Sequence, residues 1–271
     1  MAHVIPFHGT LYNPATVGDV RQVVAPPYDI IDATLQKTLH DRHPNNVIRL
    51  ELGYEQPGDT TGDNKYLRAA GALKEWLKSG ALRRDDKPAI YYHTIEYQPP
   101  YSAPGTPTKV FKGFLSTVEL EEFGSGKIYP HENTRAAAKT DRFNLLEACR
   151  ANFSAIISLY SDPQNDVLTL IERSIASDKP RIDFQDDVGF RQRLWSVTDP
   201  AVLAKVVEIS AESDKSFEEA VREGLHRATD TLDNVRGAWI KEQKVQVEKG
   251  KIVEYRVIMM VTFLLKSGKK K

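Results

Sequence analysis

The chain has 271 residues, and its 37 Lys and Arg residues balance its 37 Asp and Glu residues. A length of this order corresponds to about two ordinary domains. The neutral balance gives no support for attraction to nucleic acid or to an anionic membrane, so neither is expected as a partner. The single cysteine, Cys149, excludes an internal disulfide framework and a cysteine-based zinc site. Neither a secretory signal pattern nor an apolar run of ~20 residues is evident, so a cytoplasmic location is expected.

The first 198 residues mix helical and strand patterns. Helices are predicted at residues 66–77, 141–151 and 166–176. The apolar face of the first helix is made of Leu67, Ala70, Leu73, Trp76 and Leu77. Segments rich in β-branched and aromatic residues predict strands at residues 47–52, 89–97, 110–120, 155–160 and 190–198. This mixture predicts an α+β domain over residues 1–198.

After Asp199 the predicted order becomes strand, helix, strand and strand. The helix over residues 216–233 begins with a capping box, in which Ser216 is followed by Glu219 three positions later. The strands are predicted at residues 202–210, 238–248 and 251–265, with a two-residue turn between the last two. The fold class is therefore α+β, with a second unit at residues 202–266, in which an antiparallel sheet wraps on one helix, and a basic tail at residues 267–271.

The last strand of this unit carries apolar side chains on both of its faces. Strict alternation places Val257 and Met259 on one face, and Ile258 and Met260 on the other beside Arg256. A single helix covers one face of a sheet, so the other face needs a second cover. Association of the chain with copies of itself is the expected solution.

Three stretches of this unit resemble the dodecin family over essentially residues 202–266: KVVEISAES, SFEEAVREGLHRATDTLDNVRGAWIKEQKV and EYRVIMMVTFLL. The resemblance implies a hollow dodecamer that binds a flavin (FMN, FAD or riboflavin). It implies that the isoalloxazine ring stacks on a tryptophan and that a polar residue of the third strand holds the ring edge. The implied role is storage and sequestration of flavin rather than catalysis.

The register of the last two strands predicts which residues would meet this ligand. If the two-residue turn makes Glu248 face Lys251, then Gln243 lies opposite Arg256 and Trp239 lies opposite Met260. The expected flavin site is Trp239, Gln243 and Arg256, with the ring on the indole and the guanidinium on a ring carbonyl or a phosphate.

This unit departs from the family pattern at two positions. An alignment without gaps places the stacking tryptophan of the family on Gly237, and Arg256 stands where the family carries glutamine. The alternatives are that Trp239 and Met260 form apolar core between copies, and that Arg256 forms an ion pair with a carboxylate of a neighbouring copy.

The earlier part of the chain resembles the family called domain of unknown function 1015, through segments that include PFHGTLYNP, VVAPPYDII, KTDRFNLLEACRANFSAIISLYSD and FRQRLWSV. This family has a distant likeness to the ParB and sulfiredoxin group, whose free-serine kinases use a Gly-His-His-Arg-type loop on nucleotide phosphates. No such loop occurs in this sequence. We therefore interpret the chain as a truncated family member joined to a dodecin-like unit by gene fusion. Activity as a small-metabolite phosphotransferase is the alternative function, and the missing loop argues against it and against an enzyme.

The remaining candidates for catalysis are His131, Glu132 and Arg142, with Lys139 and Asp141 close by in the sequence. A histidine beside a glutamate has the ingredients of an acid–base pair, and an aspartate that caps a helix would leave free N–H groups for an anion. The alternative is that these charges are simply solvated.

Arg49 and Asp29 are further candidates, on the predicted 47–52 strand and after the Pro-Pro turn. Asp29 has the alternative role of fixing that turn. No metal site is expected, because His40 and His43 are three residues apart and no third ligand can be assigned.

Overall fold

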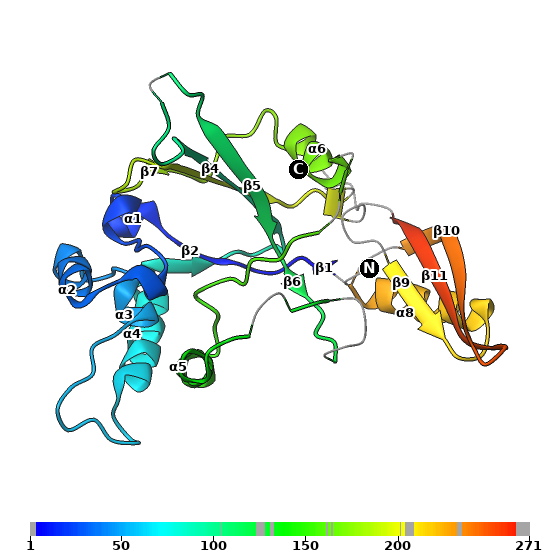
Figure 1. The fold of residues 1–271 in the computed structure, drawn as a ribbon, viewed down its shortest axis with the longest axis horizontal. Helices are drawn as coiled ribbons and strands as arrows, with labels where there is room; N and C mark the ends of the chain where they lie inside the picture. Colours follow the sequence, from blue (N-terminus) through cyan, green and yellow to red (C-terminus); the bar gives the residue numbers. More distant parts are fainter. Residues whose placement is uncertain are drawn as a thin grey trace, which may run out of the picture.

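The structure is a computed structural model that describes residues 4–103, 105–122, 128–130, 133–160, 162–163, 165–200, 202–203, 209–231 and 235–263. It is a mixed α+β fold, as the sequence predicts (Figure 1). The described strands are β1 (Val4–Ile5), β2 (Thr10–Tyr12), β3 (Leu82–Arg84), β4 (Ile90–Tyr97), β5 (Lys109–Leu115), β6 (Thr117–Val118), β7 (Ile182–Gln185), β8 (Arg191–Val197), β9 (Ile209–Ser213), β10 (Val235–Glu248) and β11 (Lys251–Phe263).

The described helices are α1 (Pro14–Val17), α2 (Ala33–Arg42), α3 (Ile48–Glu51), α4 (Lys65–Ser79), α5 (Ala136–Cys149), α6 (Asp166–Ser174) and α8 (Phe217–Thr231), with the 3₁₀ turns η1 (Val20–Gln22) and η2 (Tyr28–Ile30). Gly80 ends α4 in the left-handed conformation at φ 78°, which glycine adopts without a steric cost. None of the described helices has the length and apolar character needed to cross a bilayer.

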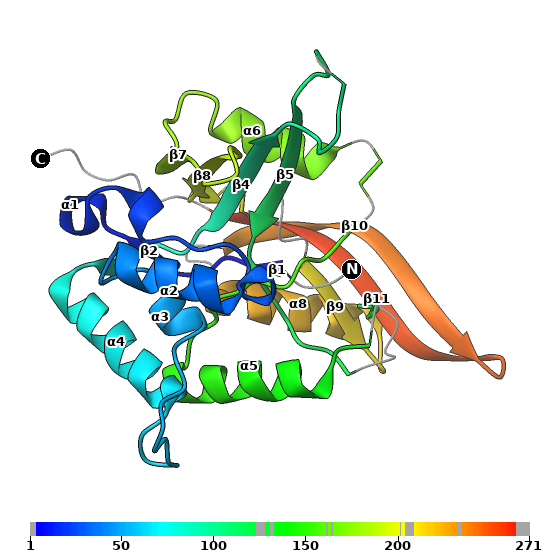
Figure 2. The same ribbon diagram turned by 60° about the vertical axis from the view of Figure 1, so that its left-hand side comes forward.

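The larger unit is built on the antiparallel sheet β5-β4-β8-β7. One face of this sheet packs on α6, where Ile171 contacts a cluster that includes Tyr92 and Val197. The helices α1 to α4 gather on another side of the unit (Figures 1 and 2). Their core joins Trp76 of α4 to Val17 of α1 and Val23. Two layers of secondary structure therefore hold this unit together.

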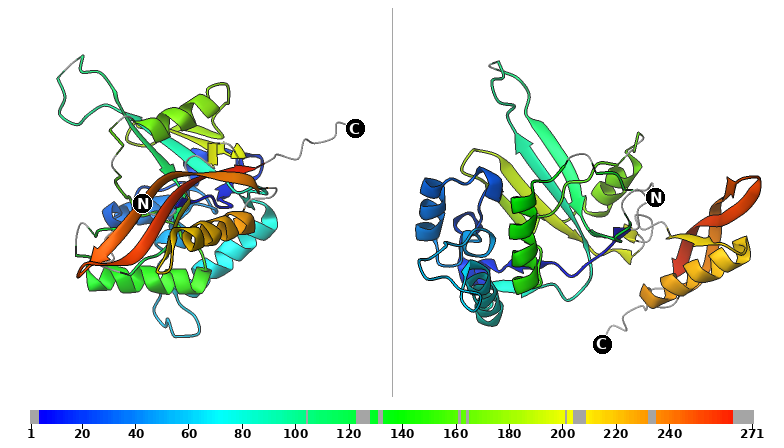
Figure 3. Two further views of the ribbon diagram at one scale, coloured as in Figure 1. Left: turned by 90° about the vertical axis from the view of Figure 1, so that its right-hand side faces the viewer. Right: turned by 60° about the horizontal axis from the view of Figure 1, so that its bottom comes forward.

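The C-terminal unit has the predicted order of strand, helix, strand and strand, with a sheet ordered β10-β11-β9 (Figure 3). Ser216 caps α8, because its hydroxyl accepts a hydrogen bond from the Glu219 N–H at 3.2 Å. The turn between β10 and β11 is formed by Lys249 and Gly250, both with positive φ, as the tightest hairpins require. The helix packs Ala220 and Ala228 against β11.

Two of the predicted strands in the larger unit are wrong. Residues 47–52 contain the helix α3, whose N-cap position is Val47, and just before it the Asn46 side chain accepts a hydrogen bond from the Ile48 N–H at 3.0 Å. Residues 155–160 form no strand, and Ile156 and Leu159 are more than 90% exposed. These residues join none of the described sheets.

Other boundaries also differ from the predictions. Helix α5 begins at Ala136, five residues before the predicted start, because three successive alanines favour the helix. Val202 and Leu203 are helical, and the first strand of the C-terminal unit is β9, which is later than the predicted 202–210. The predicted apolar face of α4 is correct at Trp76, but Leu67 and Leu77 are more than 40% exposed.

We predict that Met259→Ala lowers the free energy of unfolding of the C-terminal unit by about 2–5 kcal/mol, because it leaves a cavity beneath α8. Met259 is 1% exposed. The matched control is Ile252→Ala on the same strand, at a position 46% exposed, with an expected loss below about 1 kcal/mol. Hydrogen exchange of the β11 amides measures both values, and equal losses would contradict the observed core.

Candidate functional site

Glu51, at the end of α3, is a buried carboxylate that the structure pairs with a cation. It is 6% exposed. Arg142 of α5 donates one hydrogen bond to the carboxylate at 2.8 Å and a second to the Glu51 carbonyl at 2.9 Å. The Ser154 hydroxyl donates to the same carboxylate. A buried charge is tolerated when its partners satisfy it, so these contacts tie α5 and the chain after it to α3.

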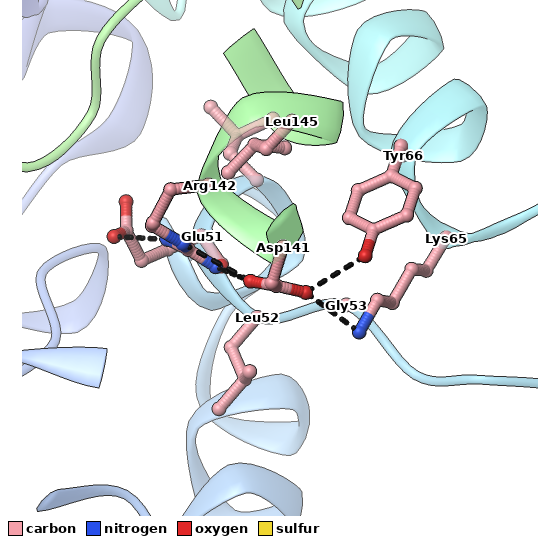
Figure 4. Close-up of a pocket in the computed structure, with 9 residues that line it drawn as sticks. Glu51, Leu52, Gly53, Lys65, Tyr66, Asp141, Arg142 and Leu145 are labelled. Carbon is pink, nitrogen blue, oxygen red and sulfur yellow. Dashed lines mark hydrogen bonds and ion pairs between the residues drawn. The ribbon is translucent and has the colours of Figure 1, made fainter. Parts of the chain in front are cut away.

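Asp141, next to Arg142, extends this network toward α4 (Figure 4). Its carboxylate accepts hydrogen bonds from Tyr66 at 2.8 Å and from Arg142, and it lies 3.0 Å from the ammonium of Lys65. Burial disfavours the charged form of Asp141, but these three partners outweigh it and hold the pKa of the carboxyl below its usual range. The group is therefore a carboxylate at neutral pH.

The side chains of Glu51, Asp141 and Arg142 leave almost no free space between α3, α4 and α5. The pocket between α3, α4 and α5 keeps a free volume of about 10 Å³, which is room for one water at most. Arg142 also lies over the Tyr28 ring, 4.1 Å from the ring centroid. A guanidinium held by two carboxylates and a ring is not available to a substrate, so the contacts of Arg142 are structural.

The prediction that Asp141 caps a helix is wrong. Asp141 lies inside α5, whose N-cap position is Arg135, and its carboxylate is occupied by side chains of α4 and α5. His131 and Glu132, the predicted acid–base pair, lie outside the described residues. Lys139 is exposed on α5.

Arg49 and Asp29 lie at separate places in the fold. Arg49 donates to the backbone carbonyl of His40 at 2.6 Å and lies 2.9 Å from the ring nitrogen Nδ1 of the same residue. Asp29 is exposed in the turn η2. In the described part of the chain, no three metal-binding side chains come together.

The structural partners Glu51, Lys65, Tyr66 and Ser154 are not apparent from the sequence. They come from three separate segments, and no spacing rule connects them. The one available signal was Glu51 inside an apolar segment, since a carboxylate among buried residues needs a cationic partner.

In the C-terminal unit the register of β10 and β11 differs from simple alternation. Glu248 pairs with Lys251 and Trp239 pairs with Met260, as predicted. Between these pairs two irregularities leave Val253 of β11 and Lys241 of β10 without a register partner. Each bulge shifts the register by one residue, and because the two lie on opposite strands, they cancel.

The predicted pairing of Gln243 with Arg256 is therefore wrong. Between the two bulges Gln243 pairs with Val257, and Arg256 pairs with Lys244. A shift of one residue moves a side chain to the other face of the sheet. Gln243 thus shares the face of Val257, which is buried beneath α8.

Arg256 lies on the sheet face away from α8, together with the backbone position of Trp239. Its register partners are Lys244 on β10 and Glu212 on β9. The guanidinium donates to Glu254, two residues earlier on the same strand, at 2.7 Å. This face therefore combines an indole position with a guanidinium that is about a quarter exposed.

The fold and the site define a mixed α+β protein that ends in a β-α-β-β unit with a three-stranded antiparallel sheet. The chain belongs to the family described as protein of unknown function (DUF1015), which matches residues 4–267. The family match thus continues past residue 198 into the C-terminal unit.

Part of the chain is also similar to dodecins. It is 34% identical over 62 residues to "Calcium dodecin" of Mycobacterium tuberculosis, a match that covers 23% of this chain and 87% of that protein. The solved structure "Dodecin from Streptomyces davaonensis" shares 32% identity, over 22% of this chain and 88% of that one, with a TM-score of 0.22.

We predict that Arg142→Ala lowers the free energy of unfolding by about 3 kcal/mol, because the buried Glu51 carboxylate loses its cation. The matched control is Lys139→Ala on the exposed side of α5, with an expected change of about 0.5 kcal/mol. Chemical denaturation followed by circular dichroism measures both. The double variant Glu51→Gln/Arg142→Met is expected to recover part of the loss of Arg142→Met alone. Equal stability of Arg142→Ala and Lys139→Ala would show that the network does not hold the fold.

Proposed function

We propose that this protein assembles through its C-terminal unit and binds a flavin on the sheet face that carries Trp239 and Arg256. The observation that carries the proposal is that, among the described residues, Ile240 and Val245 of β10 lie largely exposed. We assign the dodecin similarity to residues 202–266, where the resembling stretches occur.

The helix α8 covers only part of the sheet. Its contacts run to β9 and β11, where Val257 and Met259 are buried and Phe217 meets Tyr255 edge-on at 5.1 Å. Ile240 and Val245 of β10 pair with residues of that same buried row, yet each is 43% exposed. Apolar side chains on the helix side of β10 thus face solvent, and a second copy of the chain would cover them.

The opposite face of the sheet has the chemistry of a site for a charged aromatic ligand. At one end, Trp239 and Met260 are register partners, which supports a platform for a flat ring. Further along the same face, Lys244 and Arg256 are register partners, and both carry cationic groups. A ring carbonyl or a phosphate of the ligand would meet these donors.

Gln243 lies on the face beneath α8 by register, so it would contact the ring only from a neighbouring protomer. The family tryptophan position is Gly237, two residues from Trp239, and the bulge at Lys241 follows both. We infer that the bulge adjusts the strand so that Trp239 takes the stacking role. Each copy would also carry the larger unit, and a dodecamer is the proposed assembly.

We predict that the purified protein quenches the fluorescence of FMN on binding, because the ring stacks on an indole. Trp239→Ala is expected to weaken FMN binding about tenfold. Trp195→Phe, which changes a tryptophan of the other unit, is the control and should leave affinity unchanged. Arg256→Gln should remove any preference for FMN over riboflavin if the guanidinium meets the phosphate. An affinity that is the same for Trp239→Ala and wild type would exclude the proposed platform.

We predict that light scattering shows an assembly of about twelve chains, and that Ile240→Lys reduces the number of chains per particle. A lysine at this exposed position keeps the fold of one chain but places a charge in the apolar contact between chains. Glu242→Lys, on the opposite face two residues away, is the comparison. A monomeric wild-type protein would contradict the proposed assembly.

A further inference from the structure

Three arginines line one groove of the larger unit, and this groove is separate from the Glu51–Arg142–Asp141 network. The groove lies beside the pair β2-β3 and has a free volume of about 220 Å³. Arg83 and Arg84 of β3, Arg181, which precedes β7, and the acidic residues Asp85 and Asp86 are among the residues that line it. This volume suits a small metabolite or one charged group of a larger ligand, since sites for drug-sized ligands have about 300–1,000 Å³.

Arg181 is held in place by one end of its guanidinium. Its Nη1 donates to Asp85 at 2.5 Å and to the Ser196 hydroxyl at 2.8 Å. Asp85 also accepts a hydrogen bond from the Tyr91 hydroxyl at 2.7 Å. In the part of the chain that the structure describes, the Nε and Nη2 atoms of Arg181 make no hydrogen bond or ion pair. A positioned guanidinium whose Nε and Nη2 still carry three N–H donors can bind an oxyanion.

The contacts of Asp85 keep this arrangement charged. Burial opposes ionisation of Asp85, but Arg181 and Tyr91 outweigh it and hold the pKa of the carboxyl below its usual range. Burial and the nearby carboxylate raise the pKa of Tyr91 to about 12. At neutral pH the carboxylate is therefore ionised, the phenol is protonated, and Arg181 stays anchored.

Arg83 and Arg84 are exposed, and neither forms an ion pair with any described residue. Because Arg181 balances Asp85, the two remaining arginines outnumber Asp86, and the groove keeps an excess of positive charge. A phosphate monoester has about −1.5 to −2 charges at pH 7 and three acceptor oxygens. Its three acceptor oxygens match the donors of several guanidinium groups better than the two oxygens of a single carboxylate do.

We propose that this groove binds the phosphate group of a small phosphorylated metabolite, with Arg181 as the positioned donor and Arg83 and Arg84 as the groups that close on it. The site lies in the larger unit and is independent of the flavin site proposed above. The shared chemistry admits free phosphate as well as a phosphate ester, and the experiment separates the two.

Titration calorimetry of the full chain tests the proposal, with inorganic phosphate, glycerol 3-phosphate and malonate as probes at matched ionic strength. We expect saturable binding of at least one phosphate probe. Arg83→Ala and Arg84→Ala should each weaken the affinity about tenfold, because each variant removes one charged hydrogen bond to the phosphate. Tighter binding of glycerol 3-phosphate would identify an ester as the ligand, and equal binding would identify phosphate itself.

The control is Arg173→Ala, which removes the same charge from an exposed position on α6. The side chains of Arg83 and Arg84 are exposed and form no hydrogen bond or ion pair with other described residues, so their alanine variants should fold, and circular dichroism checks this. Arg181→Lys keeps the positive charge but removes the planar guanidinium with its several N–H donors, so it should also weaken the affinity for the phosphate probe. The proposal is wrong if no phosphate probe saturates, if Arg173→Ala weakens binding as much as Arg83→Ala, or if malonate binds as tightly as the phosphate probes.

Discussion

A β-sheet has two faces, and one helix can cover only one of them. In the larger unit this constraint is met within the chain, because α6 packs on one face of β5-β4-β8-β7 and Phe7 packs on Tyr91 of the other. In the C-terminal unit it is not met. The single helix α8 lies over β9 and β11, while Ile240 and Val245 of β10 remain exposed. The need for a further cover is what makes this unit a candidate for assembly, and the proposed flavin site lies on the opposite face of the same sheet.

The charges of the larger unit fall into two groups with different consequences. Glu51 and Asp141 are buried or half-buried and each binds the Arg142 guanidinium, which leaves almost no space for a substrate. Arg83 and Arg84 are exposed beside a groove and have no such partners. A cluster of charges in a sequence therefore says little about function until its partners are known. The charged residues around position 140 are the first candidates for a site in the sequence, but the contacts of Asp141 and Arg142 show that these two residues stabilise the fold.

Elements with a strong local signal are the ones that could be predicted from the sequence. The capping residue Ser216 and the turn at Lys249 and Gly250 act over a few residues, and the structure has both of them. Two predictions that depended on a partner in space did not hold. Residues 155–160 have the composition of a buried strand, but they join none of the described sheets. Residues 47–52 look like a strand, but they contain the helix α3, and the Asn46 side chain accepts a hydrogen bond from the Ile48 N–H before it.

The sequence by itself determined the α+β class, the order of the C-terminal elements, and the two-residue turn that sets the ends of the β10–β11 register, because these depend on propensity and short-range geometry. Only the tertiary structure decided which residues share a face between those ends. Two bulges shift the pairing by one residue, so that Lys244 rather than Gln243 lies beside Arg256. Bulges arise from the twist and packing of the whole sheet, and alternation along one strand does not reveal them. In the same way, only tertiary contacts separate the occupied Arg142 from the arginines that line the groove.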